Sequence, residues 1–328
     1  IEVGLGQTVP APAREVMRRG HGDCKDMCSL LLALLAACGV EAQPVLLSSD
    51  GEWPVVEEFP HPAAFTHMVV MVPNGGDTLY ADPTLMRPGL TALSSSVAGQ
   101  PGVTFDRAGA TRMVRITPAS AGRNGMHATY ELKPEPDNTA RLEIRMRLRG
   151  EFAGLVSDLL EHRDTIAVTD RLRRVVGYGL WGSCRLERWK IEERAADRLV
   201  LSATYRDTLW ASDPSQVEFQ IATEVADFLT AYPDTARRRA DVLFDRPFAD
   251  TVLIRLRDGA DWSPDREVAG WSGRGEGYEG SYAVAPRADG VEILQHFALR
   301  DDRMGARPYA RFFRDWAVYR AFVMQTLR

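Results

Sequence analysis

The sequence has few of the features that mark membrane proteins and nucleic-acid-binding proteins. No run of eighteen or more apolar residues occurs in its 328 residues, which excludes a membrane-spanning helix within them. A formal net charge of −5 provides no general basic surface, so we do not expect a nucleic-acid partner. With 45% hydrophobic and 26% charged residues, the composition is that of an ordinary globular protein.

Cysteine is also scarce. The chain has four cysteines, Cys24, Cys28, Cys38 and Cys184, and the first three fall on one short segment. No Cys-x-x-Cys pair occurs, and no two histidines have the spacing of zinc ligands. We therefore expect neither a disulfide framework nor a metal site nor a bound cofactor.

The length and the pattern of the chain predict an α+β protein with more than one hydrophobic core. Residues 1–90 are expected to form a core in which a helix packs on an antiparallel sheet. Residues 91–125, rich in Ser, Ala, Gly and Thr, read as a linker. Residues 126–250 predict a β-rich domain with one helix, and residues 251–328 a β-rich region that ends in a helix. Together these two regions are expected to resemble a β-sandwich with a few helices.

The best-defined predicted helix begins at Cys24, with Asp23 as its N-cap and Gly39 at its end. Its last turns are almost entirely apolar, so we expect it to be buried on most sides. A cysteine in the first turn faces the positive end of the helix dipole, which favours the nucleophilic thiolate. Lys25 adds a positive charge but Asp23 and Asp26 oppose it, so local charge alone does not decide the matter.

Two β-forming segments flank an Asn-Gly-Gly turn and predict a β-hairpin over residues 65–81. If four residues connect the strands, Val72 pairs with Asp77. Asp82 then lies directly across from His67, close enough for the carboxylate to hold the imidazole. A register that slips by one residue would separate the two side chains.

Three segments carry a resemblance to a known superfamily: Gly22-Asp23-Cys24-Lys25-Asp26, Thr66-His67, and Tyr80-Ala81-Asp82-Pro83-Thr84. Together with the leucine-rich helix they resemble the papain-like transglutaminase-like superfamily, over about residues 1–90. The likeness is greatest to bacterial multidomain members in which a β-rich domain follows the core. It implies a catalytic triad with Cys24 as nucleophile, His67 as base and Asp82 as the acid that orients the base.

The resemblance also implies an activity and a setting. The activity would be acyl transfer through a Cys24 thioester, either peptidase- or amidase-type hydrolysis or transglutaminase-type amide exchange, on a peptide or protein substrate. Relatives place a β-sandwich domain before the core, which is absent from this chain, and many act in the periplasm or at the cell surface. Cys28 departs from the pattern, because many relatives have Ala there.

Several alternatives stay open. His21 and His61 are rival bases. Cys28 and Cys38 share a helix face with Cys24 and could serve a redox role, although packing in the core is the more common use of such residues. The glycine-rich segment 273–280 lacks the features of a phosphate-binding loop and predicts a hairpin turn. Finally, the chain could be a catalytically inactive module that binds a peptide or an envelope polymer.

Overall fold

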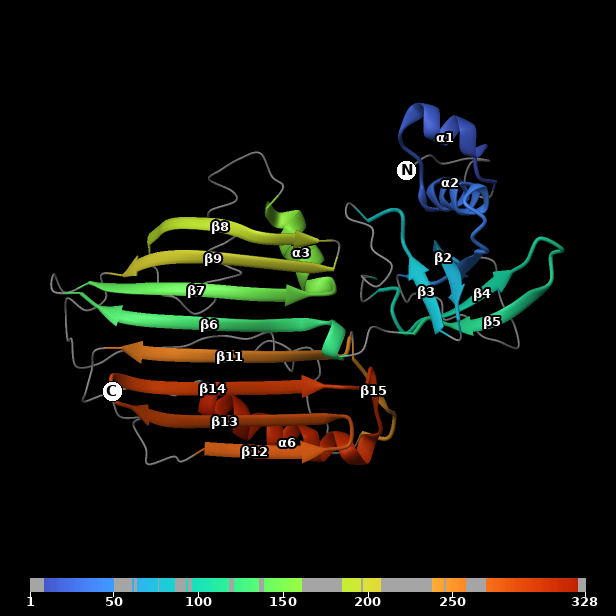
Figure 1. The fold of residues 1–328 in the computed structure, drawn as a ribbon. Coiled ribbons are helices and arrows are strands. Elements are labelled where there is room, and N and C mark those ends of the chain that lie inside the picture. The colour runs from blue at the N-terminus through green and yellow to red at the C-terminus, as the bar shows by residue number, and fades with distance from the viewer. Residues whose placement is uncertain are drawn as a thin grey trace. The chain divides into compact units, whose positions relative to one another are not determined.

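The computed structural model divides the chain into two compact units, residues 1–119 and residues 120–328. The residues that the structure describes are 9–49, 61, 64–75, 77–85, 93, 96–117, 121–135, 139–160, 185–195, 197–207, 238–244, 246–257 and 270–323. Both units combine helices with antiparallel strands (Figure 1), so the fold is of the mixed α and β kind.

The first unit is a five-stranded sheet preceded by two helices. Its elements are α1 (Ala13–Arg19), α2 (Cys24–Ala37), β1 (Gln43–Leu47), β2 (His67–Asn74), β3 (Asp77–Ala81), β4 (Pro101–Phe105) and β5 (Thr111–Arg115). The strand order is β3-β2-β1-β4-β5, and each neighbouring pair is antiparallel. The sheet therefore has β1 at its centre and β2 beside it.

Strand β2 is apolar on both of its faces. Val70 and Val72 pack with Cys28 of α2 on one face, and Val69 and Met71 belong to a second apolar cluster on the other. Successive side chains of a strand point to opposite faces, so an unbroken apolar run suits a strand covered on both sides. Helix α2 supplies one of these covers.

The expected burial of α2 on most sides is wrong. Helix α2 is covered by β2 on one face and by α1 near its first turns, whereas Leu34 on an outer face keeps 48% of its surface exposed. Ala33, Ala36 and Ala37 are exposed as well. A single sheet face contacts one stripe of a helix, and the described part of the chain places nothing over the opposite stripe.

The predicted hairpin forms, but its register differs from the prediction by two residues. Asn74 pairs with Asp77 and Val72 with Leu79, so only two residues connect the strands. Gly75 has a φ of +55°, the left-handed conformation that a two-residue hairpin turn requires. The four-residue connection was wrong because it ignored this preference.

A shift of two residues keeps every side chain on its predicted face. Val70 pairs with Ala81, so the position across from Asp82 belongs to Val69 rather than to His67. His67 lies two residues further along β2, on the diagonal. Diagonal neighbours on one face of a sheet remain within reach of long side chains.

The second unit is built on an eight-stranded sheet with the order β12-β13-β14-β11-β6-β7-β9-β8. Its elements are a 3-10 turn at Ala121–Arg123, β6 (Gly125–Pro134), β7 (Ala140–Arg149), α3 (Glu151–Leu160), β8 (Arg185–Ala195), β9 (Arg198–Asp207), β10 (Val242–Leu243), β11 (Phe248–Arg257), β12 (Gly270–Gly275), β13 (Tyr278–Arg287), β14 (Gly290–Leu299), β15 (Arg303–Met304) and α6 (Ala306–Val323). Strands β6 and β11 pair in parallel, and the other neighbours in this sheet pair antiparallel. Short strands β10 and β15 form a separate pair.

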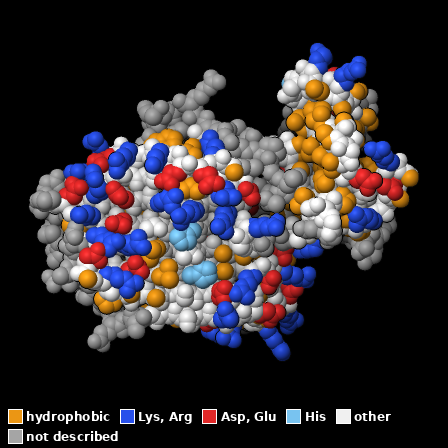
Figure 2. Space-filling view, in the orientation of Figure 1, with side chains coloured by type: hydrophobic (Ala, Val, Ile, Leu, Met, Phe, Trp, Pro, Cys, Tyr) orange, Lys and Arg blue, Asp and Glu red, His pale blue; other side chains and the backbone are white. Residues whose placement is uncertain are grey.

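One face of this sheet is apolar and the other is charged. In β7 the buried residues include Leu142, Ile144 and Met146, and the exposed ones include Arg145 and Arg147. Helices α3 and α6 contribute to the same apolar core as the strands. Charged side chains and histidine gather on the other face (Figure 2). The expected β-sandwich is therefore wrong for the described strands, because helices rather than a second sheet pack on the apolar face.

The division of the chain differs from the one expected from the sequence. The segment 91–125 contains β4 and β5, which pair into the first sheet. Strand β11 spans the expected boundary at residue 250 and lies beside β6, so regions 126–250 and 251–328 share one core. The predicted C-terminal helix is confirmed as α6, and the predicted turn in 273–280 lies between β12 and β13. Within the expected region 126–250, residues 161–184 and 208–237 lie outside the described residues.

Candidate active site

Cys24 is the first residue of α2. The helix begins there because Asp23 is extended and its Oδ1 accepts a hydrogen bond from the backbone N–H of Asp26 at 3.1 Å. Cys24 is half-buried. Its sulfur therefore combines partial access to solvent with the positive end of a helix dipole.

The charges around Cys24 form separate pairs. Lys25 bonds to Asp23, while Asp26 accepts from Arg19 at 2.8 Å and from the backbone N–H of Ala11 at 2.7 Å. Lys25 and Asp26 are both only 8% exposed. Each carboxylate beside the thiol thus has its own cation, which settles the charge balance that the sequence left open.

His67 and Asp82 lie in hydrogen-bonding contact. Nε2 of His67 is 2.7 Å from Oδ2 of Asp82. His67 is the first residue of β2, and Asp82 directly follows the last residue of β3. Asp82 is only 2% exposed, so the contact is shielded from water. With Nε2 engaged, Nδ1 is the ring nitrogen that remains for a second partner.

Cys24 lies near enough to His67 for each residue to shift the pKa of the other. Hydrogen bonding with His67 is the largest influence on the pKa of Cys24, and it lowers that pKa although burial raises it. Burial alone would lower the pKa of His67, but its bonds to Asp82 and Cys24 outweigh burial and raise the pKa to about 9. Both directions favour a thiolate paired with an imidazolium.

The second oxygen of Asp82 is held by Thr84. Oδ1 accepts from the Thr84 backbone N–H at 2.9 Å and from its hydroxyl at 2.6 Å. Burial raises the pKa of Asp82, yet the hydrogen bonds from His67 and Thr84 outweigh it, so the pKa lies below the ordinary value. The carboxylate therefore stays ionised and has a separate partner for each oxygen.

The main chain of Met68 fixes α2 on β2. The thiol of Cys28 donates to the carbonyl oxygen of Met68 at 3.2 Å. Hydrogen bonding with the backbone of Met68 also helps to lower the pKa of Cys24. Strand β3 pairs with β2 no further than Val70, so Met68 has no pairing partner on β3. Sequence reasoning missed the contact of Cys28 with Met68, since main-chain groups leave no motif.

The other cysteines lie apart from this chemistry. Cys28 is fully buried, and burial together with the charges of Asp82 and Cys24 raises the pKa of its thiol, which makes it unreactive. Cys38 is exposed at the far end of α2, about 20 Å along the helix axis from Cys24 at the standard rise per residue. It is too distant to form a disulfide with Cys24. Cys184 lies outside the described residues.

The rival bases are both exposed. His21 precedes α2, and His61 lies before the start of β2. The hydrogen bonds that govern the pKa of Cys24 come from His67 and Met68 rather than from these histidines. Of the candidates in the sequence, the structure brings together Cys24, His67 and Asp82.

The described part of the chain shows neither a cluster of metal ligands nor a membrane-spanning helix. Within it, no group of three or more His, Cys, Asp or Glu side chains is arranged to hold a metal ion. None of the helices described is long and apolar enough to cross a membrane.

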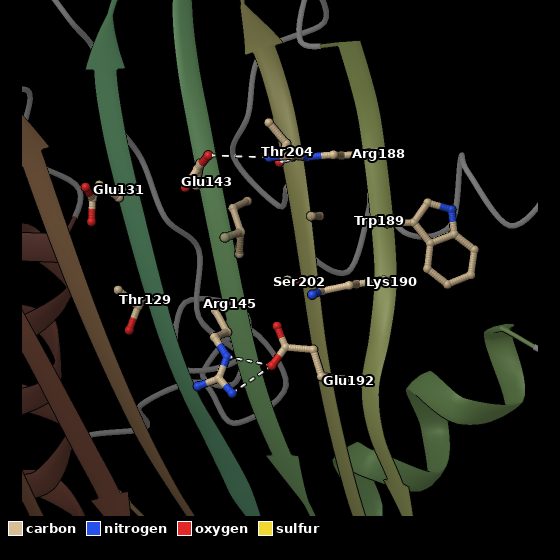
Figure 3. A pocket seen from close by; sticks show the side chains of 12 residues that line it. Thr129, Glu131, Glu143, Arg145, Arg188, Trp189, Lys190, Glu192, Ser202 and Thr204 are labelled. Carbon is tan, nitrogen blue, oxygen red and sulfur yellow. Dashed lines mark hydrogen bonds and ion pairs between the residues drawn. The ribbon is translucent and has the colours of Figure 1, made fainter.

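A hollow of about 460 Å³ lies on the charged face of the second unit, over β6 to β9 (Figure 3). Its charged side chains bond to one another. Arg145 reaches Glu192 at 2.7 Å, and Arg188 lies 3.7 Å from Glu143. The described residues that line it include neither cysteine nor histidine. Nothing in this hollow could supply a nucleophilic thiol.

Comparison with known proteins identifies no family. No model of a protein family matches the chain, and no curated protein matches it. One solved structure, described as a "putative protease" from Parabacteroides distasonis ATCC 8503, aligns with 10% identity and a TM-score of 0.49. The alignment covers 96% of this chain and 45% of that chain, so the present chain spans less than half the length of that protein. A likeness at this level supports no argument about function.

Proposed function

We propose that this chain is a thiol-dependent acyl-transfer enzyme that acts on peptide or protein amides through Cys24. The observation that carries the proposal is the 2.7 Å contact between His67 and Asp82, with Cys24 near enough to His67 for the histidine to lower its pKa. A nucleophile, a base and a group that orients the base are the parts that covalent catalysis at a carbonyl requires. Here they come from one helix start and two strand ends.

In the first step, the Cys24 thiolate attacks the carbonyl carbon of the amide. The oxygen of the resulting tetrahedral intermediate takes the negative charge. The backbone N–H of Cys24 lies in the first turn of α2, where it has no acceptor within the helix, so it is suited to bind this oxygen. His67 then gives its proton to the leaving nitrogen, the C–N bond breaks and an amine departs. A thioester on Cys24 remains.

In the second step, neutral His67 takes a proton from water as the water oxygen attacks the thioester carbonyl. The C–S bond breaks, the carboxylic acid is released and the thiolate returns to its pair with the imidazolium. An amine in place of water would give a new amide. We place hydrolysis first, because water needs no binding site of its own.

The proposal includes a cellular location and a domain context, and both rest on the resemblance of the sequence motifs alone. By that resemblance the enzyme acts in the periplasm or at the cell surface, and a preceding β-sandwich domain belongs to the natural protein. Fractionation of the native organism, with an antibody against this chain, tests the first part. Recovery in the cytosolic fraction would contradict it.

Trapping of the thioester tests the proposed chemistry. The chain is incubated with libraries of activated amides and peptides, and its intact mass is measured. We expect an acyl adduct that maps to Cys24 and disappears in Cys24→Ala. Cys38→Ala is the matched control, since it removes an exposed thiol from the same helix and should keep the adduct. An adduct that survives Cys24→Ala would contradict the proposal.

A binding module is the second candidate. The observation that favours it is the broad charged sheet face of residues 120–328, which lies in a unit without the three candidate catalytic residues. A module of this kind would bind peptide or envelope polymer equally well in Cys24→Ala and would form no acyl adduct. Calorimetric titration of both proteins with the same ligand separates the two candidates.

A further inference from the structure

We propose that Thr84 is a positioning residue of this site: it holds the Asp82 carboxylate so that Oδ2 faces His67. The inference rests on the proposed function, because it assigns a role within the same centre. Thr84 touches neither the thiol nor the ring of His67 by any hydrogen bond that the structure records. It acts through Asp82, which acts through His67.

The two oxygens of Asp82 have different partners. Oδ2 serves His67 at 2.7 Å, while both donors of Thr84 converge on Oδ1 at 2.6 and 2.9 Å. The torsion that turns a carboxylate about its own axis is broad and gives little preference for one angle. Partners on both oxygens are therefore what fixes the plane of the group.

The position of Asp82 in the fold makes this support necessary. The residue directly across from it is Val69, so Asp82 reaches His67 along the diagonal. Diagonal positions on a sheet are about 7–8 Å apart, so a tilt of the carboxylate changes the contact more than it would for directly opposed residues. Asp82 also follows the last residue of β3, where ladder pairing has ended. Thr84 replaces the constraint that the ladder no longer provides.

The burial of the two residues differs in a way that makes the inference testable. Asp82 is buried, whereas Thr84 is exposed. Removing the hydroxyl of Thr84 leaves no cavity in the core, so its effect on Asp82 can be separated from unfolding. Thr84→Ser keeps the hydroxyl, while Thr84→Val and Thr84→Ala remove it and keep the backbone donor.

The experiment uses two measurements that do not depend on turnover. The first is the titration of the His67 ring by NMR. The second is the rate at which iodoacetamide alkylates Cys24 as a function of pH, followed by peptide mapping. Thr111→Val is the matched control, since Thr111 is an exposed threonine on β5 of the same unit. Melting temperature and circular dichroism check that each variant is folded.

We expect Thr84→Val and Thr84→Ala to lower the pKa of His67 from its raised value toward the ordinary one. The thiolate–imidazolium pair then weakens, and alkylation of Cys24 at neutral pH slows by about 3- to 10-fold, as a shift of up to one pKa unit implies. Thr84→Ser and Thr111→Val should match the wild type in both measurements.

A folded Thr84→Val or Thr84→Ala with an unchanged His67 titration and alkylation profile would overturn the inference. So would a Thr84→Ser variant as impaired as Thr84→Ala. Failure of the proposed function has a different signature: the His67 shift would appear as expected, while the wild type forms no acyl adduct with any library. If Thr84→Val and Thr84→Ala both unfold, the inference is also overturned, because Thr84 would then support the fold rather than the site.

Discussion

The two units of this chain treat charged side chains in opposite ways. In the first unit, His67 and Asp82 are withdrawn from water into contact with one another and with Cys24. In the second unit, charged groups such as Arg145 and Glu192 pair on an open sheet face. Burial strengthens the interaction between charged groups and shifts their pKa values, whereas water screens an exposed ion pair, which therefore contributes little. The smaller unit, which has fewer charges, is therefore the one that carries the proposed active site.

The two units also differ in how their apolar cores are built. The first unit has apolar residues on both sides of β2, and α2 packs on one of these sides. The second unit collects its aromatic residues into one core between the sheet and its helices. There, Tyr278, Tyr282 and Tyr319 have raised pKa values because of burial, which reflects packing rather than reactivity. A shifted pKa marks a candidate site only when a nucleophile or base lies beside it.

Removing the charge of Asp82 should have the largest effect on the reactivity of Cys24. Asp82→Asn keeps the shape of the side chain but loses the charge that raises the pKa of His67. We expect alkylation of Cys24 at neutral pH to slow and any acyl transfer to fall by about 10²- to 10⁴-fold, the range for loss of general acid–base support.

Asp106→Asn is the control for that substitution. Asp106 accepts backbone hydrogen bonds in an exposed turn of the same unit and lies away from the thiol. It should leave the reactivity of Cys24 unchanged. Equal losses in Asp82→Asn and Asp106→Asn would show that the role of Asp82 is not specific.

A core substitution in the second unit should separate stability from reactivity. Phe312 is fully buried and its ring contacts Tyr278, Phe297 and Phe244. Phe312→Ala should lower the free energy of unfolding of that unit by about 3–5 kcal/mol, the usual cost of a large aromatic cavity. Denaturant unfolding measures the loss. Alkylation of Cys24 under native conditions should not change, and a parallel loss of reactivity would contradict the separation.

The pH dependence of reactivity follows from the lowered pKa of Cys24 and the raised pKa of His67. The lowered pKa of Cys24 brings the thiolate into existence below the ordinary thiol range, so alkylation should rise as pH increases through that lowered value. Acyl transfer also needs the imidazolium as acid, so it should fall as pH passes about 9, where His67 loses its proton. A bell-shaped profile is expected. Alkylation that rises only near the ordinary thiol pKa would contradict the lowered value.

We expect the smallest effect from a substitution on the charged sheet face of the second unit. Arg145→Gln removes the pair with Glu192, which lies at the surface. Exposed pairs contribute little to stability because water screens them. We expect the melting temperature and the reactivity of Cys24 to stay close to those of the wild type. A large drop in melting temperature would mean that the hollow of the second unit is organised by this pair.

Much of the candidate site could be predicted from local sequence signals. Helix capping placed Cys24 at a helix start, and β-forming residues placed His67 and Asp82 on a hairpin. An Asn-Gly-Gly segment is compatible with more than one connection, and the four-residue choice was wrong because Gly75 forms a two-residue turn. The shift of two residues preserved the faces, so the two side chains meet although the predicted pairing was wrong.

Contacts between residues far apart in the sequence could not be predicted from local signals. The bond from Cys28 to the main chain of Met68 joins residues 40 positions apart, and no local pattern of residue types indicates it. The parallel pairing of β6 with β11 joins segments more than 100 residues apart, which is why two expected regions proved to be one unit.

The central claim is that Cys24 is an activated thiol, and its reactivity relative to Cys38 tests this most directly. Cys24 is the first residue of α2 and Cys38 is its C-cap, and Cys38 is the more exposed of the two. Limited iodoacetamide at neutral pH, with peptide mapping of both sites, gives the ratio of their rates. The account predicts that the half-buried Cys24 reacts faster than the exposed Cys38, and that Asp82→Asn reverses the order. A Cys24 that reacts more slowly than Cys38 in the wild-type chain would contradict it.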